Sequence, residues 1–111
     1  MEEFIQVFTT VEKKIHAERI ARELVERRLA ACVQIVGPVE SRYRWKGHVE
    51  SAEEWLCIIK SRASLFPDLE KAIKEMHPYE VPEITAAPII AGSKDYFDWL
   101  NDSTSPTQKE L

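Results

Sequence analysis

The order of apolar and polar residues predicts strands alternating with helices from the start of the chain. Residues 4–9 (FIQVFT) form a short apolar run rich in β-formers, which is typical of a buried strand. Apolar side chains then recur at helical spacing as far as about residue 30, with oppositely charged residues four apart on the polar side. Thr9 and Glu12 have the spacing of a capping box, so we expect this helix to begin there.

After residue 32 the period changes to two, which predicts a long β-hairpin. Val39, Ser41, Tyr43 and Trp45 point to one side, and the charged residues between them point to the other. Lys46 and Gly47 supply a turn, and residues 55–60 (WLCIIK) are apolar on both faces. Gly37 and Pro38 interrupt the first arm, so we expect a β-bulge at this point.

The predicted hairpin is longer than its own domain can cover. Two arms of about a dozen residues reach roughly 40 Å. Tyr43, Trp45 and Val49 then lie exposed near the tip, in an apolar patch of the kind that marks an interface. We therefore expect an oligomer in which the hairpin lies on a neighbouring subunit. The alternative is a hairpin that curls back over its own core.

The second half of the chain predicts a helix, an edge strand and a short final helix. Ser64 can cap the second helix, Pro67 falls in its first turn, and Pro78 ends it. Residues 81–90 are typical of a strand that Pro88 confines to a sheet edge. Ser93 can cap the last helix. The apolar stripe of the second helix comprises Leu65, Leu69, Ala72, Ile73 and Met76.

The element order β-α-β-β-α-β, followed by one short helix, predicts an α+β fold of the ferredoxin-like, split βαβ type. In this fold a four-stranded antiparallel sheet carries two helices on one face. We expect residues 1–102 to form this single domain and residues 103–111 to form a flexible tail.

Composition and charge exclude some classes of function. A net charge of −4 over 111 residues argues against a dedicated nucleic-acid binder. The sequence has neither a secretory signal pattern nor an apolar stretch of the roughly 20 residues that a membrane span needs, so we expect a cytoplasmic protein. Cys32 and Cys57 lie inside apolar runs, which is typical of buried, reduced thiols.

Residues 77–83 (HPYEVPE) carry the candidate chemistry. The two prolines stiffen this stretch, so one interpretation is a rigid connector between helix and strand. The other is a metal site at His77, completed by Glu80 and Glu83. The helix end before His77 favours its imidazolium form, which opposes metal binding. His16 and His48 are expected to be solvated, and the absence of catalytic motifs indicates that the protein is not an enzyme.

Several segments, in order, resemble the CutA family of divalent-ion tolerance proteins. They are residues 29–33 (LAACV), 43–47 (YRWKG), 59–61 (IKS), 77–83 (HPYEVPE) and 96–100 (YFDWL). The resemblance implies a cytoplasmic homotrimer of ferredoxin-like subunits with interlocking hairpins and a PII-like architecture. It also implies a role in tolerance of divalent metals, copper above all.

The resemblance leaves two functional hypotheses open. The first is a metal-response protein that binds copper(II) or another divalent cation through His77, the one residue here that matches the copper ligands assigned in the family. Phe8-Thr9 stands where those ligands include a cysteine, and Met76 replaces a second histidine. The second is a PII-like regulatory or scaffold trimer that binds a small effector or a protein partner between subunits. Its cleft candidates are Tyr79, Lys60 and Trp45.

Overall fold

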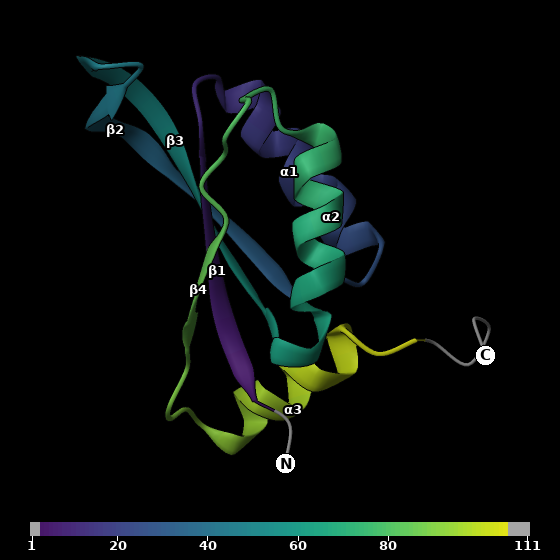
Figure 1. The fold of residues 1–111 in the computed structure, drawn as a ribbon. Coiled ribbons are helices and arrows are strands. Elements are labelled where there is room, and N and C mark those ends of the chain that lie inside the picture. The colour runs from purple at the N-terminus through teal and green to yellow at the C-terminus, as the bar shows by residue number, and fades with distance from the viewer. Residues whose placement is uncertain (1–2, 107–111) are drawn as a thin grey trace.

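The computed structural model describes residues 3–106 as a four-stranded antiparallel sheet with three α-helices (Figure 1). The strand order is β2-β3-β1-β4, and all pairings are antiparallel. This arrangement confirms the predicted ferredoxin-like α+β fold. The elements are β1 (Phe4–Val11), α1 (Lys14–Glu26), β2 (Cys32–Trp45), β3 (His48–Arg62), a 3₁₀ turn (Ala63–Leu65), α2 (Phe66–Met76), β4 (Thr85–Pro88) and α3 (Lys94–Ser103).

The core lies between the sheet and the helices α1 and α2, which both cover the same face of the sheet (Figure 1). Every second residue of β1 is buried there, because successive side chains of a strand point to opposite faces. Helix α1 contributes Ala17, Ile20 and Leu24 to this core. Helix α2 contributes Leu69, Ala72 and Ile73.

The predicted start of the first helix is wrong by several residues. Strand β1 continues to Val11, because its ladder with β3 runs as far as the pair of Val11 and Trp55. Thr9 is fully buried within that ladder and cannot cap a helix. Helix α1 follows Lys13, which makes no side-chain capping bond, and it ends at Glu26 rather than near residue 30.

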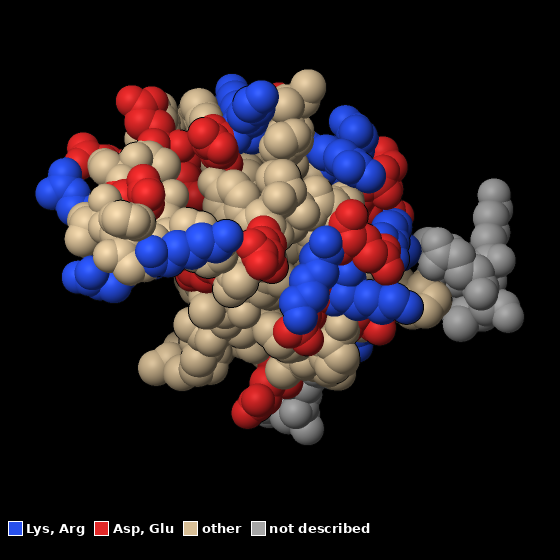
Figure 2. All heavy atoms as spheres, turned by 45° about the horizontal axis from the view of Figure 1, so that its top comes forward, with Lys and Arg blue, Asp and Glu red and all other residues tan. Residues whose placement is uncertain are grey.

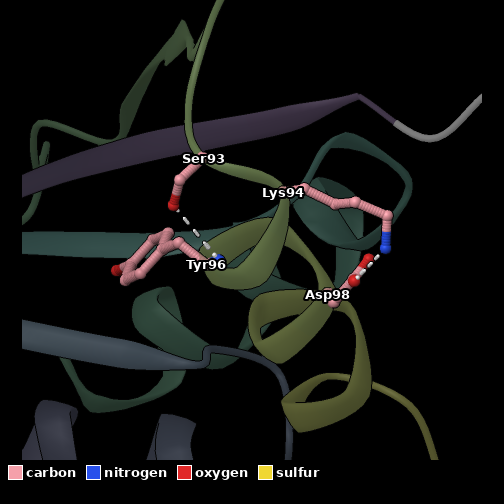
Figure 3. Close-up of polar contacts among 4 residues, drawn as sticks. All are labelled: Ser93, Lys94, Tyr96 and Asp98. Carbon is pink, nitrogen blue, oxygen red and sulfur yellow. Dashed lines mark hydrogen bonds and ion pairs between the residues drawn. The ribbon is translucent and has the colours of Figure 1, made fainter.

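The two predicted serine caps differ in outcome. Ser64 lies inside the 3₁₀ turn, and Leu65 occupies the N-cap position of α2, so that expectation is wrong. The Ser93 hydroxyl does accept a hydrogen bond from the Tyr96 backbone N–H at 3.4 Å (Figure 3). One turn of α3 is also bridged by Lys94, whose Nζ lies 2.7 Å from a carboxylate oxygen of Asp98 (Figure 3).

Strands β2 and β3 form the predicted hairpin, and its tip projects away from the helices (Figure 1). The pairing register shifts between Val36 and Val39, which confirms the bulge at Gly37-Pro38. Near the tip, Tyr43 is 44%, Trp45 38% and Val49 62% exposed. Val49 pairs with Arg44 and therefore lies on the opposite face of the hairpin from Tyr43 and Trp45. The three exposed apolar side chains expected at the tip are present, but they are divided between its two faces.

The end of the domain lies further along the chain than predicted. Strand β4 pairs only with β1, so it is an edge strand as expected, but it spans four residues rather than 81–90. Thr104 is only 3% exposed, and its carbonyl oxygen accepts a hydrogen bond from Arg62 at 2.7 Å. Arg28 donates to the carbonyl oxygens of Asp102 and Ser105. Of the expected tail, residues 103–105 are thus held by the domain, and residues 107–111 lie outside the described residues.

Candidate functional site

His77 follows helix α2 and ties the 77–83 loop to the end of β1. The residue is 9% exposed, and its Nε2 lies 2.9 Å from the carbonyl oxygen of Thr10. The backbone N–H of Tyr79 donates to Nδ1 at 3.2 Å. Because Nδ1 accepts a hydrogen bond, the remaining proton lies on Nε2 and is donated to Thr10. The two bonds therefore select one neutral tautomer.

The electrostatic surroundings of His77 agree with this neutral form. Burial lowers the pKa of the imidazole, and this effect outweighs the Thr10 carbonyl and the Glu54 carboxylate, which favour the cation. His16 adds to the lowering. The expectation that the helix end would hold His77 as a cation is wrong, because removal of the ring from water dominates.

The residues proposed as metal ligands are not assembled into a metal site. Glu80 and Glu83 are both exposed, and the Glu83 carboxylate accepts a hydrogen bond from the Thr85 hydroxyl at 2.9 Å. Among residues 3–106, no group of three His, Cys, Asp or Glu side chains could hold a metal ion. His77 would also have to release the Tyr79 N–H before Nδ1 could bind copper. As placed, these residues do not fit a copper ion.

The other histidines and the cysteines occupy separate places. His48 is exposed beside the hairpin turn, as expected. His16 is half-buried and its Nδ1 is buried without a hydrogen-bond partner in the described structure, so the prediction of a solvated side chain is wrong. Burial raises the pKa of the Cys57 thiol to about 11, which makes it unreactive. Cys32 is only partly buried.

The hydroxyl of Tyr79 points at Glu54, a residue that the sequence analysis did not select. It donates a hydrogen bond to Glu54 Oε2 at 2.7 Å. Burial and this carboxylate both raise the pKa of Tyr79, so the phenol stays protonated as a donor. Glu54 is only 5% exposed. The one feature of the sequence that could have indicated Glu54 is its position directly before the apolar run 55–60. Strand β3 changes from exposed to buried residues at this point.

Glu54 and Tyr79 line a groove of about 620 Å³ between the hairpin and the 77–83 loop. We call it the hairpin groove. It brings together Trp45, Tyr79, Glu80 and Glu83, which the sequence analysis had proposed for two different sites. The complete lining is Thr10, Ser41, Arg42, Tyr43, Arg44, Trp45, Glu54, Tyr79, Glu80, Val81 and Glu83.

Lys60 does not belong to the hairpin groove of its own chain. It lies six residues beyond Glu54 on β3, which is about 20 Å along a strand. Its Nζ donates to Gln34 Oε1 at 3.0 Å and lies 5.8 Å from the ring centre of Tyr96. The single chain therefore separates Lys60 from the other two cleft candidates.

The hairpin groove is suited to binding and orienting a molecule. Its walls include three aromatic rings, and a buried carboxylate lies among them.

Lys and Arg side chains are interspersed with Asp and Glu side chains on the face of the molecule in Figure 2. No helix within residues 3–106 is long and apolar enough to span a membrane.

The fold and the groove together define a small ferredoxin-like α+β protein with a projecting hairpin and a groove at its side. Comparison with known proteins then gives the family. The family model of the CutA1 divalent ion tolerance protein matches residues 5–103, and the chain belongs to this family.

Individual relatives cover nearly all of the chain. The divalent-cation tolerance protein CutA of Thermus thermophilus is 46% identical over 104 residues, which are 94% of this chain and 99% of that protein. A solved structure of the divalent cation tolerance protein from Thermus thermophilus has a TM-score of 0.88 at 47% identity and covers 95% of this chain and 100% of its own. The CutA1 structure from Oryza sativa has a TM-score of 0.90 at 42% identity, with 95% of this chain and 96% of its own covered.

Some relatives are longer proteins with other destinations. The match with the chloroplastic CutA protein of Arabidopsis thaliana is 44% identical and covers 90% of this chain but 55% of that protein. A structure from Archaeoglobus fulgidus is described as a periplasmic divalent cation tolerance protein. The family therefore includes proteins named for different compartments.

Proposed function

We propose that this chain acts in divalent-cation tolerance as a cytoplasmic, homotrimeric binding protein, and that its ligand site is the hairpin groove. The observation that carries the proposal is the contact of Tyr79 with the buried Glu54 inside a groove bounded by the hairpin. Sites for small molecules are usually preformed recesses of this kind, lined by aromatic side chains and a few polar groups. The role is regulatory or protective rather than enzymatic.

The helix-free face of the sheet supports the homotrimer. The register of β1 and β3 places Phe8, Leu56 and Ile58 on the face opposite the core, and all three are only half-buried. An apolar sheet face with a projecting hairpin beside it suits association with further copies of the chain. In a PII-like trimer the hairpin would reach a neighbouring subunit and border the clefts between subunits.

Copper(II) coordination at His77 is the competing hypothesis, and it stays a prediction. The neutral imidazole is the form that metals bind, and a metal-bound histidine commonly donates its other ring N–H to a backbone carbonyl, as Nε2–H does here. The bond from Tyr79 N–H to Nδ1 opposes it, since a metal would have to replace that bond. We therefore favour the hairpin groove over His77 as the ligand site.

A thermal-shift screen of nucleotides, amino acids and divalent cations tests the proposal. It would use the wild type, the groove variant Tyr43→Ala, and Val49→Ala as the control. Both residues are exposed apolar positions near the hairpin tip, but only Tyr43 lines the groove. We expect at least one compound to raise the Tm of the wild type and of Val49→Ala, with a smaller rise for Tyr43→Ala.

Light scattering on the same samples ensures that the variants are compared in one oligomeric state. The proposal is overturned if no compound stabilises the wild type. It is also overturned if Tyr43→Ala responds as strongly as the wild type to every compound found.

A further inference from the structure

We infer that the hairpin groove selects small molecules that carry a guanidinium or primary ammonium group on an apolar body, with the cationic group held by Glu54. The inference rests on the proposed function, which identifies the groove as the ligand site, and adds the chemical class of the ligand.

Glu54 supplies a largely buried carboxylate as an acceptor. One carboxylate oxygen, Oε2, receives the Tyr79 hydroxyl, while Oε1 accepts no hydrogen bond among those described and is not fully enclosed by the protein. The residue is only 5% exposed, yet it lines the groove. A carboxylate forms a stronger hydrogen bond with a charged N–H donor than with a neutral one. A guanidinium or ammonium group supplies that donor.

Aromatic side chains stand on the same side of the hairpin as Glu54. In the β2–β3 register Val39 pairs with Glu54, so Tyr43 and Trp45, two and three alternations further along β2, share its face. Tyr79 closes the groove from the loop. Rings around a carboxylate accommodate an apolar body and attract a cation through their π faces. Lys46 illustrates this preference, since its Nζ lies 5.7 Å from the Trp45 ring centre.

The rim of the groove carries charges of both signs and therefore favours neither cationic nor anionic ligands. Arg42 and Arg44 lie there, together with Glu80 and Glu83. Arg42 is already 3.1 Å from the Glu40 carboxylate, and both of these side chains are largely exposed. Exposed charges are screened by water and salt, whereas a largely buried carboxylate such as Glu54 is screened less. The buried carboxylate consequently decides which sign of charge the groove accepts.

Calorimetric titration with n-butylguanidinium and with its neutral isostere n-butylurea tests this inference. We expect the full-length wild type to bind n-butylguanidinium at least about tenfold more tightly than n-butylurea. Glu54→Gln should remove most of that preference. Glu53→Gln is the matched control, because Glu53 precedes Glu54 on β3, is exposed and does not line the groove. It should keep the preference.

Tyr79→Phe keeps the inference testable should Glu54→Gln fail to fold. This variant retains the ring and frees Oε2, so binding of n-butylguanidinium should be kept or strengthened. Loss of binding in Tyr79→Phe, equal binding of the two probes by the wild type, or no binding of either probe would overturn the inference. If the wider screen still finds a ligand that depends on Tyr43, only the ligand class is wrong and the groove remains the proposed site.

Discussion

At the scale of the residue, His77 acts through hydrogen bonds that require its neutral form. It joins the end of β1 to the 77–83 loop, because Nε2–H reaches Thr10 and Nδ1 receives the Tyr79 N–H. Tyr79 is thereby placed with its hydroxyl against Glu54. Protonation of the ring would turn Nδ1 into a donor facing another donor. His77 thus positions the loop that closes the hairpin groove.

This role predicts a pH-dependent contribution of His77 to stability. The pKa of His77 in the folded chain is lowered, while the unfolded residue titrates near 6.5. The folded state therefore binds fewer protons in this range, and the contribution of His77 is complete above pH 6.5 and lost progressively below it. We expect the free energy of unfolding of the wild type to fall more steeply below pH 6.5 than that of His77→Gln, in urea titrations from pH 5 to 8.

The exposed His48 provides the control for this experiment, since it lies beside the hairpin turn and has no hydrogen bond of this kind among those described. His48→Gln should follow the wild-type pH dependence. Parallel curves for the wild type and His77→Gln would contradict a neutral, structural His77.

The sequence located the candidate loop but not the chemistry of its side chains. The residues of HPYEVPE could be identified because two prolines interrupt the patterns of helix and strand. The charge state of His77 could not, because it depends on burial against Thr10 and Glu54, which are distant in sequence. Glu54 was missed for the same reason. Its burial results from the approach of Tyr79, 25 residues away.

At the scale of the element, the β2–β3 hairpin is shaped by close packing at its bulge. A Cβ atom added at Gly37 would lie 2.6 Å from Trp55 Cε3 and 2.9 Å from Trp55 Cδ2. The same added Cβ atom would also lie 3.1 Å from the backbone carbonyl oxygen of Glu54. Gly37 therefore allows the indole of Trp55 to pack over the bulge, next to Glu54, which lines the hairpin groove.

We expect Gly37→Ala to destabilise the protein by about 1–3 kcal/mol, because the added methyl group overpacks this contact. Urea denaturation measures the effect. In a Trp55→Phe background, which lacks the larger indole ring, the same substitution should cost clearly less. An equal cost in both backgrounds would show that contact with the indole is not the cause.

Periodicity predicted the elements well where local and long-range preferences agree. The bulge at Gly37-Pro38, the edge position of β4 and the Ser93 cap all follow from residues with strong local preferences. The capping box at Thr9 failed because pairing with β3 continues past it and buries its side chain. Tertiary pairing overrode a local signal in that case, and nothing within residues 9–12 indicates it.

At the scale of the whole molecule, the single chain leaves two apolar surfaces uncovered. One is the helix-free side of the sheet around Phe8, Leu56 and Ile58, and the other is the hairpin tip. The sequence predicted the second from the length of the hairpin, whereas the first requires the strand register. Both surfaces are accounted for if three copies of the chain associate, as we propose.

We expect the wild type to have three times the chain mass of 12.8 kDa, about 38 kDa, in sedimentation equilibrium at low micromolar concentration. Trp45→Ala should shift the population toward smaller species, because an exposed aromatic side chain that becomes buried on association is a common determinant of interface affinity. Lys13→Ala, an exposed position before α1, serves as the control. A wild-type mass of one chain, or a Trp45→Ala variant as stable as the wild-type trimer, would contradict this assignment.

The proposed site depends on His77 supporting the hairpin groove through hydrogen bonds rather than serving as a metal ligand. A calorimetric copper(II) titration of the wild type and of His77→Ala in a weakly chelating buffer, with folding and mass checked for both, decides between these roles. We expect the same affinity and number of copper ions for the two proteins, or no binding by either. A site present in the wild type and lost in a folded His77→Ala variant of unchanged mass would refute the structural role and establish the 77–83 loop as a metal site.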